Sequence, residues 1–206
     1  MIDILEHLNA VQREVSRTGE TVTVLMRRSY QAEPAELWDA LTDPERMRRW
    51  FWPVTGDFRV GGTFQLQDMA GGEILECEPP QRFKVTFGAP NSLLELRLLP
   101  GSGSSTELEL EHSMSEAPAP GGADALWVGP GWDGGLLGLA LYVTGALPAD
   151  ADPVQMADSA EVIRYNELSV RAWIEAIRSS DTNTPEADLT EAAKISMAQF
   201  APDATL

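Results

Sequence analysis

The spacing of apolar positions changes within the first thirty residues. From Asp3 to about residue 17, apolar residues recur at intervals of three and four, the spacing of one helix face: Leu5, Leu8, Val11 and Val15. From Thr21 to Tyr30 they alternate with other residues, and β-branched side chains are frequent. We predict an N-terminal helix followed by a first strand.

Two short helices are predicted next, each marked by a proline. Pro34 and Pro44 stand where a helix can begin, and Asp43 can cap the second helix. The buried face of the first helix is formed by Leu37, Trp38 and Leu41. The second helix is predicted to run through Trp50.

Short alternating segments, separated by glycine and proline, continue to residue 112. Phe58 and Val60, the turn at Gly61-Gly62, then Phe64 and Leu66 indicate a hairpin. Further strands are predicted near residues 73–78, 83–87, 94–98 and 106–112, the last with leucines on one face and glutamates on the other. The pattern predicts an antiparallel meander of about six strands.

A long helix is predicted over the glycine-containing stretch 131–143, with one face formed by Trp132, Leu136, Leu139 and Val143. Four glycines lie between residues 131 and 138, and each costs about 1 kcal/mol of helix propensity relative to alanine. Tertiary contacts must therefore hold this helix. The glycines serve either close packing on the sheet or room for a ligand.

The last sixty residues are predicted to form a helical extension after an acidic linker at 147–153. One amphipathic helix is expected over residues 156–179, with an apolar stripe of Ile163, Val170, Trp173, Ile174 and Ile177, and another after Pro185. The stripe must be buried, either across its own domain or in a homodimer. Packing within one chain is the simpler expectation.

Composition and charge restrict the partners. The chain carries 32 acidic and 15 basic residues, a formal charge of −17, which opposes nucleic acid and anionic membranes. Cys77 is the only cysteine, so no intrachain disulfide can form, and we expect it to be a small buried residue. No signal peptide and no run of about 18 apolar residues is visible. A cytoplasmic location is expected.

Several motifs resemble the START-like or SRPBCC superfamily, and within it the branch related to activators of the heat-shock-protein ATPase. They are Arg28-Ser29-Tyr30, the segment 35–47 with Arg49-Trp50-Phe51, Gly61-Gly62, the segment 72–76, and Gly131-Trp132. The resemblance covers about residues 21–145. It implies an α+β helix-grip fold, in which a curved antiparallel sheet of about six to seven strands surrounds a long helix. This assigns residues 21–146 to the domain, 1–20 to an N-terminal helix and 147–206 to a helical extension.

The resemblance also implies three functions, because members of this superfamily bind apolar molecules, cyclise them or assist other proteins. The first hypothesis is non-catalytic binding of a small apolar molecule, lipid- or polyketide-like, between the sheet and the long helix. The alternatives are a cyclase or aromatase-like enzyme using His112, Arg28 or Tyr142, and an accessory protein of a chaperone ATPase. The residues expected to contact the ligand are Met26, Arg28, Phe64, Leu66, Phe87, Leu94, Leu96, His112, Trp132, Leu136 and Leu139.

The polar and aromatic candidates each allow a structural explanation too. His112 shares a strand face with Leu108 and Leu110, so it either meets a ligand or is a core histidine bonded within the protein. Arg28 has the parity of Met26 and either orients an anionic group inside or pairs with a surface acid. The cluster Trp50-Phe51-Trp52 either gates a pocket or is core.

No cofactor or metal site is predicted. Glu107, Glu109 and Glu111 are expected to form a solvated strand face paired with Arg97 or Lys84. The spacing of acidic residues and histidines encodes no calcium or zinc site. Neither a Gly-x-Ser-x-Gly motif nor a phosphate-binding loop is present.

Overall fold

The computed structural model describes residues 3–115, 117–148, 151–157, 159–202 and 204. They form an α+β fold built on one eight-stranded antiparallel sheet in the order β1-β2-β8-β7-β6-β5-β4-β3. The strands are β1 (Gln12–Thr18), β2 (Thr21–Tyr30), β3 (Val54–Gly56), β4 (Thr63–Leu66), β5 (Gly71–Glu78), β6 (Arg82–Phe87), β7 (Ala89–Pro100) and β8 (Thr106–Met114). The helices are α1 (Ile4–Asn9), α2 (Pro34–Thr42), α3 (Pro44–Met47), α4 (Ala125–Val143), α5 (Pro153–Ala157), α6 (Ala160–Ser179) and α7 (Glu186–Phe200).

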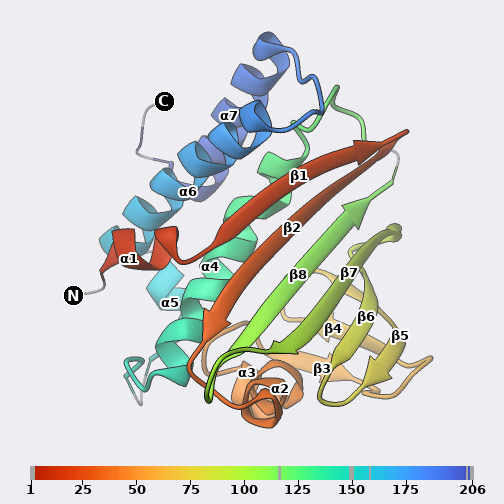
Figure 1. The fold of residues 1–206 in the computed structure, drawn as a ribbon, viewed down its shortest axis with the longest axis vertical. Helices are drawn as coiled ribbons and strands as arrows, with labels where there is room; N and C mark the ends of the chain where they lie inside the picture. The colour runs from red at the N-terminus through yellow and green to blue at the C-terminus, as the bar shows by residue number, and fades with distance from the viewer. Residues whose placement is uncertain (1–2, 116, 149–150, 158, 203, 205–206) are drawn as a thin grey trace.

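The sheet curves around one side of the long helix α4, and this confirms the predicted helix-grip fold (Figure 1), with eight strands in place of the predicted six to seven because residues 12–18 add an edge strand. Helices α2 and α3 lie at the end of the sheet where β2 ends, while α6 and α7 lie beyond α4 near the β1 edge (Figure 1). Asp43 caps α3 as predicted, since its carboxylate accepts the backbone N–H of Glu45 at 2.8 Å. The order of the elements and the cap of α3 therefore agree with the sequence prediction, but α3 ends at Met47 instead of running through Trp50.

The predicted N-terminal helix is wrong in its second half. Helix α1 ends at Asn9, and residues 12–18 form the edge strand β1, paired in register with β2 through a tight turn at Gly19 (φ +62°). The misleading signal is the spacing of Val11 and Val15, because a separation of four places two residues on one face of a helix and also on one face of a strand. Pairing with β2 selects the strand.

The predicted hairpin around Gly61 is shifted along the chain. Phe58 and Val60 are exposed and lie in the loop between β3 and β4, whereas the first strand of the hairpin is residues 54–56. Gly56 explains the shift, because a side-chain carbon there would lie 2.2 Å from the Thr63 carbonyl oxygen. The close approach at Gly56 fixes the strand pair four residues earlier than the apolar alternation suggests.

Strand β5 carries a bulge that also corrects the expectation for Cys77. The register shifts between Ile74 and Glu76, so Leu75 has no direct partner on β6. A bulge of this kind reverses the alternation of faces beyond it. Ile74 and Cys77, which differ in parity, therefore turn to the same side, and the Cys77 thiol is exposed rather than buried.

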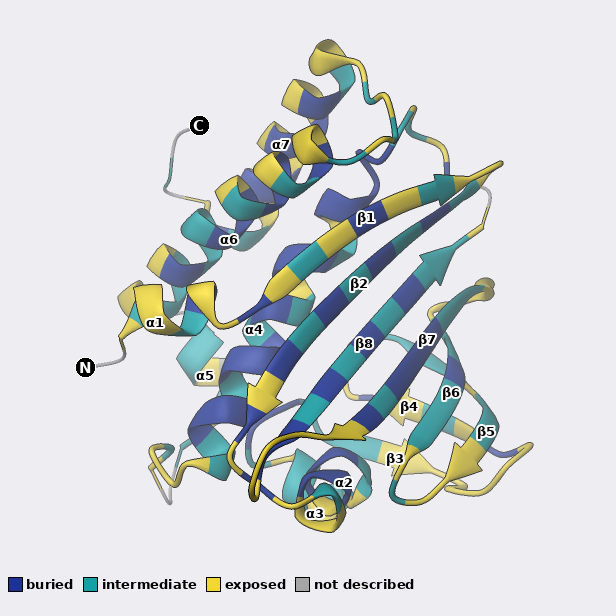
Figure 2. Cartoon of the chain, viewed as in Figure 1, coloured by how far each residue is buried: buried dark blue, intermediate teal, exposed yellow. Residues whose placement is uncertain are grey.

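The outer face of the sheet is an ion-pair network, as the glutamate alternation on β8 predicts. Arg97 reaches Glu109 at 3.0 Å and Glu111 at 2.8 Å, and Arg82 reaches Glu95 at 2.7 Å. Along β2 and β8, buried residues of the inner face alternate with intermediate ones (Figure 2). Successive residues of these strands thus point alternately to the buried inner face and to the charged outer face of the sheet.

The C-terminal extension packs on its own domain. The stripe of Val170, Trp173, Ile174 and Ile177 is buried, and it shares one hydrophobic core with β1, β2 and α4. The predicted helix 156–179 is two helices instead, because Ser159 caps α6 by accepting the N–H of Val162. Residues 149–150 of the predicted linker and residue 158 of the predicted helix lie outside the described residues.

A buried carboxylate on α4 joins the extension to the sheet. Asp133 is fully buried and receives two bonds from Arg13 of β1, at 2.8 and 3.0 Å. From α6 it receives the indole N–H of Trp173 at 2.9 Å and the Ser169 hydroxyl. One side chain therefore holds β1, α4 and α6 together, although the sequence pattern gave no sign of it.

We predict that Asp133→Asn lowers the free energy of unfolding by about 3–5 kcal/mol, because it leaves the Arg13 guanidinium buried without a counter-charge. Urea denaturation followed by circular dichroism would measure this. Glu45→Gln is the control, since Glu45 pairs with Arg48 on the surface and its loss should cost at most about 0.5 kcal/mol. Equal effects of the two variants would contradict the anchoring role of Asp133.

Candidate ligand-binding cavity

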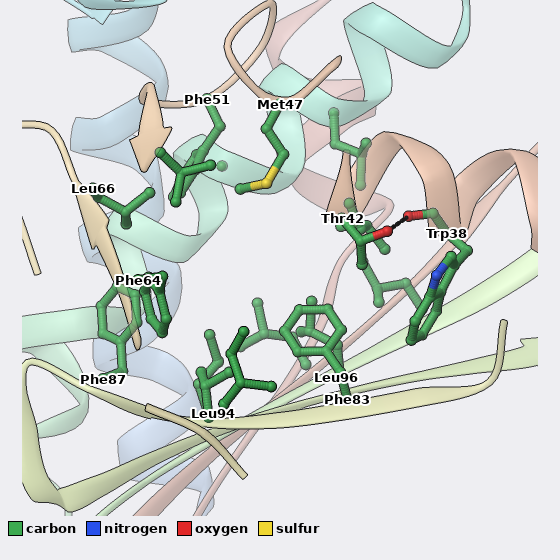
Figure 3. Close-up of a pocket in the computed structure, with 18 of the residues that line it drawn as sticks. Trp38, Thr42, Met47, Phe51, Phe64, Leu66, Phe83, Phe87, Leu94 and Leu96 are labelled. Atoms are coloured by element: carbon green, nitrogen blue, oxygen red, sulfur yellow. Dashed lines mark hydrogen bonds between the residues drawn. The ribbon is translucent and has the colours of Figure 1, made fainter. Parts of the chain in front are cut away.

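A cavity of about 320 Å³ lies between the sheet, α2, α3 and α4. Figure 3 shows its walls, with Trp38 and Thr42 of α2 on one side, Phe64 and Leu66 of β4 on another, and Phe83, Leu94 and Leu96 beneath. The residues that line it are Trp38, Leu41, Thr42, Met47, Trp50, Phe51, Val54, Phe58, Arg59, Phe64, Leu66, Ile74, Cys77, Phe83, Val85, Phe87, Leu94, Leu96, Leu108, Leu110, Trp132, Gly135, Leu136 and Leu139.

Two simple periodicities place ten of these twenty-four residues. On β6, β7 and β8 every second residue faces the cavity: Phe83, Val85 and Phe87, then Leu94 and Leu96, then Leu108 and Leu110. On α4 the lining residues Trp132, Leu136 and Leu139 follow the helical spacing of four and three. The sequence pattern alone therefore predicts these positions.

The polar atoms along the walls are mostly engaged within the protein. The Thr42 hydroxyl donates to the Trp38 carbonyl at 2.8 Å, a bond drawn in Figure 3. The indole N–H of Trp50 donates to the Ala40 carbonyl at 3.0 Å. Arg59 is the one charged residue among the lining side chains, and it is exposed. The interior is thus apolar, and recognition there depends on shape and burial.

Eight of the eleven residues predicted to contact a ligand line this cavity: Phe64, Leu66, Phe87, Leu94, Leu96, Trp132, Leu136 and Leu139. Met26 is fully buried in the core and does not reach the cavity. Arg28 and His112 are also absent from its walls. The parity argument identified their face correctly, but the inner face of β2 packs against α4, and His112 at the end of β8 borders a separate outer groove instead of the cavity.

Arg28 is buried beneath the N-terminal helix. It is 6% exposed, its Nη2 lies 2.7 Å from Nδ1 of His7, and its guanidinium lies 5.4 Å from the centre of the Tyr30 ring. Burial and the neighbouring Arg28 lower the pKa of His7, which favours a neutral imidazole that accepts this bond. Arg28 thus holds α1 against β2, with no salt bridge to an acid among the described residues.

His112 is a core histidine with both ring nitrogens engaged. Trp132 Nε1 donates to its Nδ1 at 2.9 Å, and its Nε2 lies 2.7 Å from the Ser92 hydroxyl. An indole N–H can only donate, so Nδ1 accepts and the proton of the neutral ring is on Nε2. Burial lowers the pKa of His112 to about 4. The imidazole positions Trp132, which forms part of the cavity wall.

The aromatic cluster after α3 is both core and cavity wall. Trp50 and Phe51 are buried and line the cavity. The Phe51 ring is stacked on Trp132 with centroids 6.5 Å apart, and it meets Trp52 edge-on at 5.3 Å. These contacts connect the segment after α3 with α4 on the far side of the cavity.

Some glycines of α4 allow close packing, and others border open space. A side-chain carbon at Gly138 would lie 2.6 Å from the Trp50 carbonyl oxygen, and one at Gly129 would lie 2.3 Å from the Trp173 ring, so these two allow close packing. At Gly134 the nearest atom would be 3.9 Å away. Gly131 and Gly134 border a second, outer groove of about 570 Å³, which shares Phe51, Phe87 and Trp132 with the cavity.

Several lining residues were not predicted. Trp38, Leu41 and Met47 come from α2 and α3, where the amphipathic pattern indicates a buried face without saying what that face meets. Ile74 and Cys77 follow from the bulge in β5, which has no sequence signature here. Arg59 belongs to a loop that was assigned to a strand.

Within the described part of the chain, no group of three or more His, Cys, Asp or Glu side chains is placed to hold a metal ion. A search of the same residues for a helix able to cross a membrane found none.

Residues 31–144 match the family model described as Activator of Hsp90 ATPase homolog 1-like protein. The crystal structure of CalU16 from Micromonospora echinospora is 34% identical, covers 82% of this chain and 99% of its own, and superposes with a TM-score of 0.67. The solution structure of CalU16 gives 35% identity, coverage of 84% and 97%, and a TM-score of 0.70.

A third similar structure is DynU16, described as a putative protein in the dynemicin biosynthetic locus. It is 25% identical, covers 66% of this chain and 51% of its own, and has a TM-score of 0.51. No curated protein matches the chain.

We predict that the His112 ring is neutral at pH 6 and protonates only near pH 4, as measured by NMR titration of its ring signals. Its pKa in the folded protein lies below the ordinary value of 6.5, so the unfolded chain binds the proton more readily. Stability is therefore complete above pH 6.5 and falls, by on the order of 3 kcal/mol, as the pH drops to 4.

His112→Gln should make the stability of the protein less steeply dependent on pH over this interval. An imidazole that titrates near 6.5 in the folded protein would contradict the prediction.

Proposed function

This chain belongs to the Activator of Hsp90 ATPase homolog 1-like family, and within it we propose a non-catalytic binding protein for a small apolar molecule held between the sheet and α4. The observation that carries the proposal is the cavity of about 320 Å³ with apolar walls. Its size is that of a site for a small ligand, and burial of the ligand's apolar surface would supply most of the affinity.

The placement of the polar side chains favours binding over cyclisation. A cyclase needs groups that reach the substrate and exchange protons with it. His112 is bonded on both sides and lies outside the cavity, and Arg28 lies beneath α1. The third candidate, Tyr142, accepts a bond from Arg46 at 3.1 Å and is likewise absent from the cavity walls. The three groups do not converge on one reacting atom.

The likeness to DynU16, described as belonging to a biosynthetic locus, supports a biosynthetic product as the ligand. We propose lipid- or polyketide-like chemistry for it, since most of the lining side chains are aliphatic or aromatic. The acidic surface and the lone cysteine support action in the cytoplasm.

The direct test is native mass spectrometry of the protein purified from its own host. We expect a retained small molecule in the wild-type protein and less of it in Leu94→Trp, because Leu94 points into the cavity and a larger ring would take up part of its volume. Leu93→Trp is the matched control, since Leu93 is the neighbour of Leu94 on β7 but does not line the cavity. An empty wild-type protein that also fails to bind uncharged apolar probes would contradict the proposal.

The family match favours one second candidate, an accessory role for a chaperone ATPase exerted through the surface. If this is correct, the purified protein should raise the ATPase rate of the host's Hsp90-type chaperone. Leu94→Trp should then act as well as the wild-type protein, because its surface is unchanged. Loss of stimulation on filling the cavity would instead connect the two functions.

A further inference from the structure

The cavity has a single cationic side chain at its mouth. Phe58 and Arg59 belong to the loop between β3 and β4, and both line the cavity although they are exposed, so the cavity reaches the surface here. The other lining residues are uncharged. The chain has 32 acidic and 15 basic residues, and Arg59 forms an ion pair with Asp57 of the same loop, which does not line the cavity.

The loop is built so that Arg59 keeps this place. Arg59 N–H donates to the Asp57 carbonyl at 2.8 Å, and Gly62 N–H donates to the Arg59 carbonyl at 2.8 Å. The loop is also hydrogen-bonded to Ile74 of β5. The Gly61 N–H donates to the Ile74 carbonyl at 2.8 Å, and the Ile74 N–H donates to the Gly62 carbonyl at 2.9 Å. A side-chain carbon at Gly62 would lie 2.0 Å from the Asp57 carbonyl oxygen, so this turn requires glycine. These hydrogen bonds therefore attach the loop directly to the cavity wall at Ile74.

The guanidinium of Arg59 is oriented by one hydrogen bond, and some of its N–H donors have no partner among the described residues. Asp57 accepts only the Nε–H of Arg59, at 2.8 Å, and among the described residues no further hydrogen bond engages its two terminal nitrogens. An arginine presents five N–H donors in a planar fork that matches a carboxylate. Donors thus remain at the rim of an apolar space, beside the exposed ring of Phe58.

We infer that the ligand of this cavity is amphipathic, with an apolar body inside and an anionic head, such as a carboxylate, held by Arg59 at the mouth. This inference rests on the proposed binding function and adds the polarity and orientation of the ligand. Elsewhere the negative surface repels an anion, so the Arg59 rim sets which end of the molecule enters. The apolar body supplies most of the affinity, and Arg59 supplies the selection.

The test compares decanoate with 1-decanol, which share one apolar chain and differ in the charged head. Affinities are measured by displacement of the uncharged fluorophore N-phenyl-1-naphthylamine from the full chain at neutral pH. Arg59→Gln is expected to weaken decanoate binding about fivefold, the upper range for an exposed charge pair, and to leave 1-decanol unchanged.

Arg48→Gln is the matched control. It removes the same charge from an exposed arginine of the segment after α3, which does not line the cavity. Decanoate affinity should therefore remain at the wild-type value in this variant. The difference in decanoate affinity between the wild-type protein and Arg59→Gln should also shrink as the salt concentration is raised, because salt screens exposed charges.

The outcomes separate the two proposals. If 1-decanol binds and Arg59→Gln changes the affinity for decanoate no more than Arg48→Gln does, the inference of an anionic head is wrong, while the proposed binding function stands. If neither compound displaces the fluorophore from the wild-type protein, or the fluorophore itself does not bind, the binding function fails as well.

Discussion

The position of the cavity depends on how α4 is turned about its own axis, and the carboxylate of Asp133 fixes that rotation. Neighbouring residues of a helix point about 100° apart, so with Asp133 directed to Arg13 and α6, Trp132 must point towards β8. A buried charge of this kind tolerates few alternatives, because any rotation that removes it from Arg13 leaves both charges unpaired. The apolar face of α4 thereby meets the sheet in one orientation.

The same constraint explains why the space beside α4 stays open. On the side away from the sheet, α4 is held by α6 through Asp133 and by the close contact of Gly129 with Trp173. At its other end Gly138 lies against the Trp50 backbone. The helix is therefore fixed by partners other than the cavity walls, and the sheet, which curves away towards β5 and β4, cannot close onto it (Figure 1). Apolar side chains face a space that they do not fill.

Alternation and capping made much of this fold predictable. The strand positions of Val85, Leu94, Leu108 and their neighbours follow from a period of two, and α4 follows from its apolar face. What the sequence could not supply were features decided by distant partners: β1 in place of a longer helix, the bulge at Leu75, and the separation of α5 from α6. Each depends on a pairing or cap that local spacing does not record.

In the candidate site, too, local spacing predicted some features, and contacts with distant partners decided the others. Inward parity fixes a face, but it does not say whether that face meets a helix or an open space, and this is why Arg28, Met26 and His112 were expected in the cavity. In the folded chain one terminal nitrogen of Arg28 is bonded to His7, and both ring nitrogens of His112 are bonded to Ser92 and Trp132, whereas the buried Nε of Arg28 has no partner among the described residues. Buried polar side chains thus organise the walls, and the space that remains is apolar because its polar neighbours are already satisfied. Selection by charge can then occur only where the cavity meets water, at the loop that carries Arg59.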